Sequence, residues 1–259
     1  MKLKPLLPGD RIAIVAPSSP FDNEKLSSAC EMLENRGFRV STGKHVRNRR
    51  GYLAGTESER AEDLMHAILS PDVAAVFCVR GGYGSGRLLP WLPFSLFRDK
   101  PKIFLGHSDV TFLHLAFRTH VGWPTLHGPN AIAMAEFGDR FENTLLALSG
   151  KREFRWEFLQ PQVLRHGRAA GPVIGGNLTC LVHLLGTPHF PDPSGAILFV
   201  EDRGEALYRL DRMFAQLKLA GILERLAGLI LGSFTECGEV PSVWDMVMEH
   251  VAAFSYPVI

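Results

Sequence analysis

The sequence predicts an α/β protein built on a parallel sheet. Short apolar runs alternate with amphipathic segments through the first half of the chain, which is the pattern of strands joined by crossover helices. The strand-like runs are apolar at nearly every position, as expected of strands that are buried on both faces. Two of them lead directly into glycine-rich or polar loops, and parallel strands place such loops at one edge of the sheet.

Five strands are expected in the first part of the chain, at residues 11–16, 38–41, 73–79, 102–106 and 125–128. Helices are predicted between them, where apolar residues recur every three or four positions, at residues 26–33, 56–70 and 110–119. The second of these helices has the clearest boundaries. Thr56 and Glu59 form a capping box at its start, and Pro71 stops it.

The composition of the chain changes after Gly150. Residues 151–168 mix charged, aromatic and proline residues without a period, so we interpret them as a crossing between a domain at 1–150 and a second domain at 169–259. The second domain again alternates, with strands expected at 196–201 and 229–234 and helices at 178–185, 207–219 and 243–252. The last four residues, Tyr256-Pro-Val-Ile259, resemble the opening of one more strand.

Composition excludes several classes of protein. The 259 residues carry 28 Lys and Arg against 27 Asp and Glu, so no general attraction to nucleic acid or to an anionic membrane is expected. No apolar run approaches the roughly 18 residues of a membrane helix, and the N-terminus lacks the apolar core of a signal peptide. The four cysteines are widely spaced, which favours buried, reduced thiols and a cytoplasmic location over disulfides or zinc.

The first candidate site is the loop after the third predicted strand, Arg80-Gly-Gly-Tyr-Gly-Ser-Gly86. Several glycines after a strand let the backbone approach a ligand closely and direct N–H groups toward an anion. The spacing does not fit a dinucleotide fingerprint, and no Walker A motif is present. A tight turn between a strand and a helix is the alternative explanation.

The second candidate site is the junction Gly106-His-Ser-Asp-Val110, where a serine follows a strand-ending glycine at the mouth of a helix. This arrangement resembles a nucleophile elbow, which would expose the Ser108 hydroxyl and direct the Asp109 N–H toward a developing oxyanion. In the alternative interpretation, Ser108 is only the N-cap of the following helix.

Glu201 ends the apolar strand of the second domain, where a carboxylate can orient a catalytic histidine. The alternative there is a solvated turn in which Asp202 pairs with Arg203. None of the ten histidines has the spacing of a metal site, so no metal is expected, and His183 and His189 favour a structural role.

Taken together and in order, these segments resemble the LD-carboxypeptidase family of serine peptidases, whose relatives include the microcin C immunity peptidases. The resemblance covers nearly the whole chain. The matching segments are Gly9–Ser18, Arg80–Gly84, Gly106–Asp109, His127–Pro129, Gly175–Thr179, Glu201-Asp202 and Tyr208–Arg212.

The resemblance implies a flavodoxin-like N-terminal domain that bears the nucleophile, a smaller C-terminal α/β domain that carries the triad carboxylate, and a homodimer. It also implies hydrolysis of an L,D peptide bond without any cofactor or metal. The expected substrate is a small muropeptide, the cytoplasmic murein tetrapeptide, from which D-alanine is released in cell-wall recycling. By position, Ser108 is the nucleophile, Glu201 is the carboxylate of a Ser–His–Glu triad, and the Gly82 and Asp109 N–H groups form the oxyanion hole. Arg80 and Asn177 are candidates for substrate contact.

The family pattern places the catalytic histidine in a Gly-His-Gly segment directly after a strand of the Tyr-Pro-Val-Ile type. No histidine of this sequence has that context, so we expect the C-terminal domain as given to be incomplete. Two other functions remain open. One is an immunity-type peptidase acting on aminoacyl-nucleotide conjugates, and the other is a non-catalytic α/β ligand-binding module.

Overall fold

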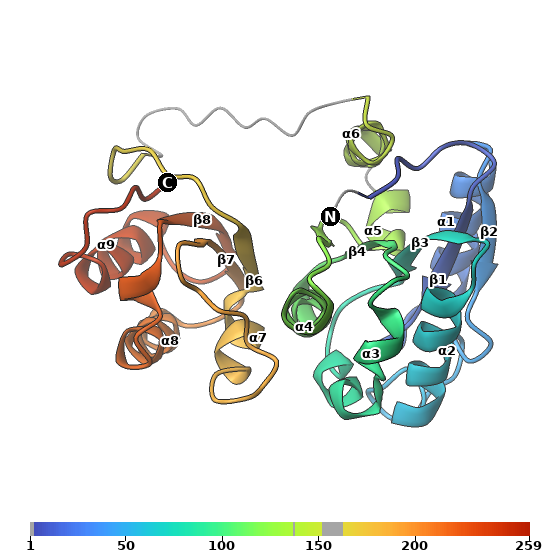
Figure 1. The fold of residues 1–259 in the computed structure, drawn as a ribbon, viewed down its shortest axis with the longest axis horizontal. Helices are drawn as coiled ribbons and strands as arrows, with labels where there is room; N and C mark the ends of the chain where they lie inside the picture. The colour runs from blue at the N-terminus through green and yellow to red at the C-terminus, as the bar shows by residue number, and fades with distance from the viewer. Residues whose placement is uncertain (1–2, 137, 152–162) are drawn as a thin grey trace. The chain divides into compact units, whose positions relative to one another are not determined.

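The computed structural model describes residues 3–136, 138–151 and 163–259. The chain divides into two compact units, residues 1–154 and 155–259, and each contains its own parallel sheet (Figure 1). The crossing expected at 151–168 falls largely on residues 152–162, which lie outside the described residues.

The first unit has a five-stranded parallel sheet in the order β2-β1-β3-β4-β5. Its strands are β1 (Arg11–Val15), β2 (Arg39–Thr42), β3 (Val73–Cys78), β4 (Ile103–Gly106) and β5 (Leu126–His127). Its helices are α1 (Asn23–Glu34), α2 (Glu57–Leu69), α3 (Phe94–Phe97), α4 (Thr111–Val121), α5 (Ala131–Glu136) and α6 (Gly138–Leu148), with 3₁₀ turns η1 (Ser85–Trp91) and η2 (Ser108–Val110). This strand order is the flavodoxin-like one, in which ligands bind at the carboxyl ends of the strands near β1 and β3.

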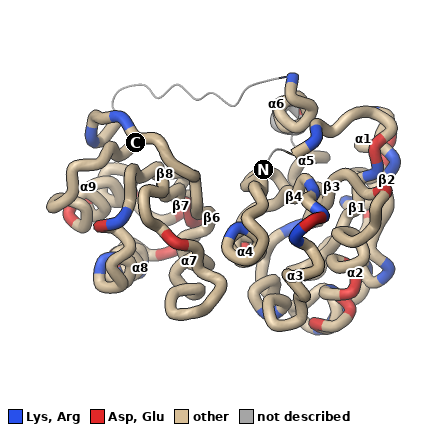
Figure 2. Tube along the Cα trace, viewed as in Figure 1, with Lys and Arg blue, Asp and Glu red and all other residues tan. Residues whose placement is uncertain are grey.

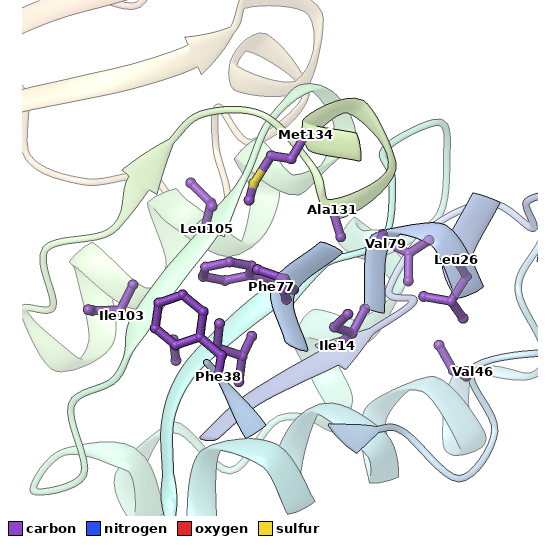
Figure 3. Packing of buried hydrophobic residues seen from close by; sticks show 14 of the residues in the cluster. Ile14, Leu26, Phe38, Val46, Phe77, Val79, Ile103, Leu105, Ala131 and Met134 are labelled. Carbon is purple, nitrogen blue, oxygen red and sulfur yellow. The ribbon is translucent and has the colours of Figure 1, made fainter. Parts of the chain in front are cut away.

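Alternate residues of the strands face opposite helical layers. Ile14 of β1, Phe77 of β3 and Leu105 of β4 pack against α1 and α5 in one apolar cluster (Figure 3). On the other face, Phe104 of β4 stacks edge-on against Phe117 of α4. Because both faces are covered, the central strands β1, β3 and β4 are apolar at nearly every position, which is why they are easily recognised in the sequence.

The second unit is a three-stranded parallel sheet in the order β6-β7-β8. Its elements are β6 (Val173–Asn177), α7 (Leu178–His183), β7 (Ile197–Arg203), α8 (Leu207–Leu219), the 3₁₀ turn η3 (Leu223–Arg225), β8 (Gly228–Thr235) and α9 (Val240–His250). The segment Pro257–Ile259 runs beside β8, with Leu231 N donating to Ile259 O at 2.7 Å and Ile259 N donating to Leu229 O at 3.1 Å. The expected opening of a further strand is therefore present.

The α/β fold class and the parallel sheets are confirmed. The helices α3, α5 and α6 and the strand β6 were not predicted from the sequence, and of these β6 is the element that its own residues disfavour. Its Gly175-Gly-Asn177 sequence is a poor strand pattern, and the strand forms because β7 pairs with it along its full length. The four cysteines are free, as expected, with three buried and Cys30 half-buried.

Charged side chains of both signs are interspersed along the two units, in line with the near-zero net charge (Figure 2). Among the described residues, no helix is long and apolar enough to cross a membrane.

Candidate active site

Ser108 lies two residues after the end of β4 in a strained backbone conformation. Its φ is +63°, and only one other non-glycine residue in the described part of the chain, Glu236, has a positive φ. Left-handed geometry at a serine between a strand and a helix is the hallmark of a nucleophile elbow. Ser108 caps neither following helix, because His107 precedes η2, Val110 precedes α4, and neither makes a capping side-chain bond. The N-cap interpretation is therefore wrong.

Two glycines leave room for this elbow. A Cβ at Gly81 would lie 2.9 Å from the Ser108 Cβ and 3.0 Å from the His107 carbonyl oxygen, so the loop after β3 approaches the elbow as closely as a glycine allows. At Gly82 a Cβ would lie 2.4 Å from the Ser19 Oγ, and its φ of +114° suits glycine alone. Tyr83 N donates to that same Ser19 Oγ at 3.0 Å, which ties the loop after β1 to the loop after β3.

Three histidines lie in the elbow segment or next to it. His114 on α4 is buried, and its Nε2 bonds the Gly106 carbonyl oxygen at 2.9 Å, while the His107 Nδ1 bonds Gly128 O at 3.1 Å. The His127 ring lies 6.1 Å from each of the other two rings. Burial lowers the pKa of all three, to about 4 for His114 and about 3 for His127. The three imidazole rings are therefore neutral at pH 7. Their contacts connect β4, β5 and α4.

The Asp109 carboxylate joins the elbow to the two neighbouring loops. It is buried and accepts from Ser18 Oγ at 2.6 Å, from Ser85 N at 2.8 Å and from Gly84 N at 3.2 Å. Arg80 leaves this loop with its side chain exposed and its Nη1 donating to Pro20 O at 3.2 Å. The loops after β1, β3 and β4 thus meet at one edge of the sheet.

In the second unit, Glu201 lies near the carboxyl end of β7, paired with Asn177 of β6 and opposite an irregularity in β8. Burial, followed by the neighbouring charge of Asp202, raises the pKa of Glu201 to about 7, and a hydrogen bond from the Asn177 side chain partly offsets this rise.

Asp202 is buried and does not pair with Arg203 through their side chains. Its carboxylate accepts from the Asn177 Nδ2 at 3.0 Å and from Thr179 N at 2.9 Å and Oγ1 at 2.8 Å, while Arg203 pairs with Glu236. The solvated-turn interpretation is therefore wrong. The Asn177 Oδ1 also caps α7 by accepting from Cys180 N at 3.0 Å, so this side chain holds the loop beside Glu201.

Sequence reasoning missed the residues that support the site. Arg60 on α2 is 2% exposed and donates to Gly84 O at 2.8 Å, and Ser18 binds Asp109. A signal for Arg60 is present in the sequence. It falls on the same helical stripe as the buried Leu64 and Ala67, where a charged residue needs an internal partner.

Comparisons with known proteins agree with this architecture. Residues 12–128 match the LD-carboxypeptidase N-terminal domain, and residues 170–259 match the LD-carboxypeptidase C-terminal domain. The probable murein peptide carboxypeptidase of Bacillus subtilis is 40% identical over 255 residues, which cover 96% of this chain and 80% of the relative.

Two solved structures are similar over most of their length. The muramoyltetrapeptide carboxypeptidase of Oxalobacter formigenes matches with a TM-score of 0.80 at 32% identity, covering 96% of this chain and 87% of that one. The microcin C7 self-immunity protein MccF, in complex with aspartyl sulfamoyl adenosine, matches with a TM-score of 0.87 at 26% identity, covering 100% of this chain and 89% of that one.

Both domain models match in the expected order, and together they cover most of the chain. The names of the relatives support a carboxypeptidase role. The chain belongs to the LD-carboxypeptidase family.

Proposed function

We propose that this protein is a serine carboxypeptidase that cleaves an L,D peptide bond and releases the terminal D-alanine of murein tetrapeptide in cell-wall recycling. The observation that carries the proposal is the strained Ser108 two residues after the end of β4, in a chain of this family. A serine is kept in this strained backbone conformation where its hydroxyl has to be exposed to a substrate.

In the proposed mechanism, the Ser108 Oγ attacks the carbonyl carbon of the scissile bond while a histidine takes its proton. Glu201 holds that histidine in the correct tautomer and stabilises its charged form. The Gly82 and Asp109 N–H groups donate to the oxyanion, and each such donor is worth about 3–4 kcal/mol in comparable enzymes. We expect the exposed guanidinium of Arg80 to bind the terminal carboxylate of the peptide. Asn177 of the second unit remains a candidate for contact with the substrate.

The family pattern places the histidine of the triad after a strand of the Tyr-Pro-Val-Ile type, and residues 256–259 have this sequence. The segment Pro257–Ile259 lies parallel to β8, and β8 pairs with the strand that carries Glu201. The Tyr-Pro-Val-Ile segment and Glu201 therefore belong to the same sheet, an arrangement that lets a histidine next to this segment meet the Glu201 carboxylate.

The decisive experiment uses murein tetrapeptide and a matched tetrapeptide that ends in L-alanine, with products identified by mass spectrometry and chiral chromatography. We expect release of D-alanine only, and loss of this activity in Ser108→Ala with an unchanged fold. Full turnover by the alanine variant would overturn the serine mechanism.

A second candidate function is that of an immunity-type peptidase. It is favoured by the likeness to MccF, whose structure was solved with an aminoacyl sulfamoyl nucleoside. Incubation with an aminoacyl-nucleotide conjugate distinguishes the two, because release of the amino acid from the conjugate and not from the tetrapeptide would favour this function. If a fluorophosphonate probe left Ser108 unlabelled in a polypeptide that carries the triad histidine, and neither substrate were cleaved, the protein would instead be a non-catalytic ligand-binding module.

A further inference from the structure

We propose that the side chains of Asp109 and Arg60 act as a two-sided clamp on the backbone of Gly84 and so position the oxyanion hole. The inference rests on the proposed serine mechanism, in which Gly82 and Asp109 supply the oxyanion donors through their backbone. It assigns these two side chains a role as positioning residues.

The clamp holds one residue from both sides. The Gly84 N–H donates to the Asp109 Oδ1 at 3.2 Å, and the Gly84 carbonyl oxygen accepts from the Arg60 Nη1 at 2.8 Å. Arg60 also donates to the Pro17 carbonyl oxygen, at the end of the strand that neighbours β3. Gly84 follows Gly82 by two residues, so fixing its peptide groups limits where the Gly82 N–H can point.

The Asp109 carboxylate makes this arrangement possible because it can only accept hydrogen bonds. Three donors converge on its two oxygens, from Ser18, Gly84 and Ser85. The Ser85 hydroxyl in turn donates to the Asp109 backbone carbonyl, so the loop and the elbow are joined at several points. An asparagine in this place would turn an N–H₂ group toward one of the three donors and leave it unsatisfied.

The two charges of the clamp compensate each other. Asp109 is 3% exposed and Arg60 is 2% exposed, and the carboxylate and the guanidinium interact electrostatically on either side of Gly84. A buried carboxylate alone next to an oxyanion hole would oppose the developing negative charge. The guanidinium opposes this effect, as do the three donors from which the carboxylate accepts hydrogen bonds.

The test compares Asp109→Asn with a matched control, Asp63→Asn. Asp63 is also buried in the first unit, at 5% exposure, and accepts from His45 N at 2.9 and 3.2 Å, away from the elbow. Two quantities are measured in each variant. They are the amide hydrogen exchange of residues 82–85 and the rate at which a fluorophosphonate modifies Ser108.

We expect Asp109→Asn to speed exchange at residues 84 and 85 at least tenfold and to slow modification of Ser108 on the order of 10²-fold, with the affinity for the tetrapeptide within threefold of wild type. Asp63→Asn is expected to lower thermal stability without either effect. If Asp109→Asn does not fold, Ser18→Ala removes one bond to the same carboxylate and is expected to show both effects at a smaller size.

Unchanged exchange at residues 84 and 85 in Asp109→Asn would overturn the clamp, as would equal losses of modification rate in the two variants. The proposed function fails separately, if Ser108 is not modified at all in an otherwise wild-type polypeptide that carries the triad histidine. In that case the exchange measurement still decides whether Asp109 holds the loop.

Discussion

At the scale of single residues, the site rests on a serine in a backbone conformation that a side chain disfavours. Ser108 has a φ of +63°, and the left-handed region costs a residue with a Cβ roughly 1–2 kcal/mol. The rest of the elbow keeps it there. Gly81 lies against its Cβ, and the Asp109 carboxylate holds the next residue to two loops. This strain can be measured separately from catalysis.

We expect Ser108→Gly to be more stable than Ser108→Ala by about 1 kcal/mol, because only glycine is free of strain at this φ. Denaturant unfolding of the two variants measures the difference. The control is Ser28 in α1, an exposed helical position, where alanine is expected to be the more stable by a similar amount. Equal stability of the two Ser108 variants would mean that the elbow is not strained.

Glu201→Gln is expected to leave the fold intact and to lower the rate constant of hydrolysis on the order of 10⁴-fold, since an amide cannot hold and stabilise a charged imidazole. Steady-state kinetics on the tetrapeptide measures the effect. Glu236→Gln is the matched control, because Glu236 is an exposed carboxylate just after β8 that pairs with Arg203. A Glu201 variant with the rate of this control would remove Glu201 from the proposed triad.

At the scale of elements, the second sheet depends on a strand that side chains do not specify. Gly175 in β6 has a φ of +135°, and a Cβ there would lie 1.8 Å from the Phe199 carbonyl oxygen of β7. At Gly175 the backbones of β6 and β7 therefore lie so close together that no side chain fits between them. This close pairing places Asn177 next to Glu201.

Gly175→Ala is expected to destabilise the protein by more than 3 kcal/mol, because it combines a strained φ with a clash against backbone. Gly186→Ala is the control. It shares the positive φ, at +78°, but has open space around it, so it is expected to cost only about 1 kcal/mol. Thermal or denaturant unfolding measures the stability of both variants. A similar loss of stability in the two would show that the close approach of β6 and β7 adds nothing to the cost of a side chain at position 175.

At the scale of the whole molecule, buried titratable groups make stability depend on pH in two opposite ways. The three histidines of the first unit have folded pKa values below their unfolded value of about 6.5. Their contribution is complete above pH 6.5 and is lost as the pH falls toward 4 and 3. The raised pKa of Glu201, about 7, has the opposite effect, because its contribution is lost as the pH rises from about 4.5 through 7.

Below pH 6.5 the histidines outweigh the single carboxyl group, so we expect acid to destabilise the wild type. His114→Gln keeps a donor for the Gly106 carbonyl oxygen but cannot titrate, and it is expected to remove about 3 kcal/mol of the loss between pH 6.5 and 4. Glu201→Gln is expected to gain stability relative to wild type between pH 5 and 8. Free energies of unfolding measured across this range check both signs, and parallel curves for variants and wild type would contradict them.

The sequence by itself determined the α/β class, most of the strands and the candidate residues Ser108 and Glu201. It could do so because strands buried on both faces are apolar throughout, and because a serine or a carboxylate at the end of such a strand is locally visible. Only the tertiary structure decided that β6 is a strand, that Ser108 is strained and caps no helix, and that Asp202 faces Asn177 and Thr179. It also revealed that the side chains of Asp109 and Arg60 both hydrogen-bond the backbone of Gly84. These features depend on contacts between residues 23 or more positions apart. A backbone that pairs through glycines, or a buried charge whose partners lie on another loop, leaves no periodic signal in its own segment.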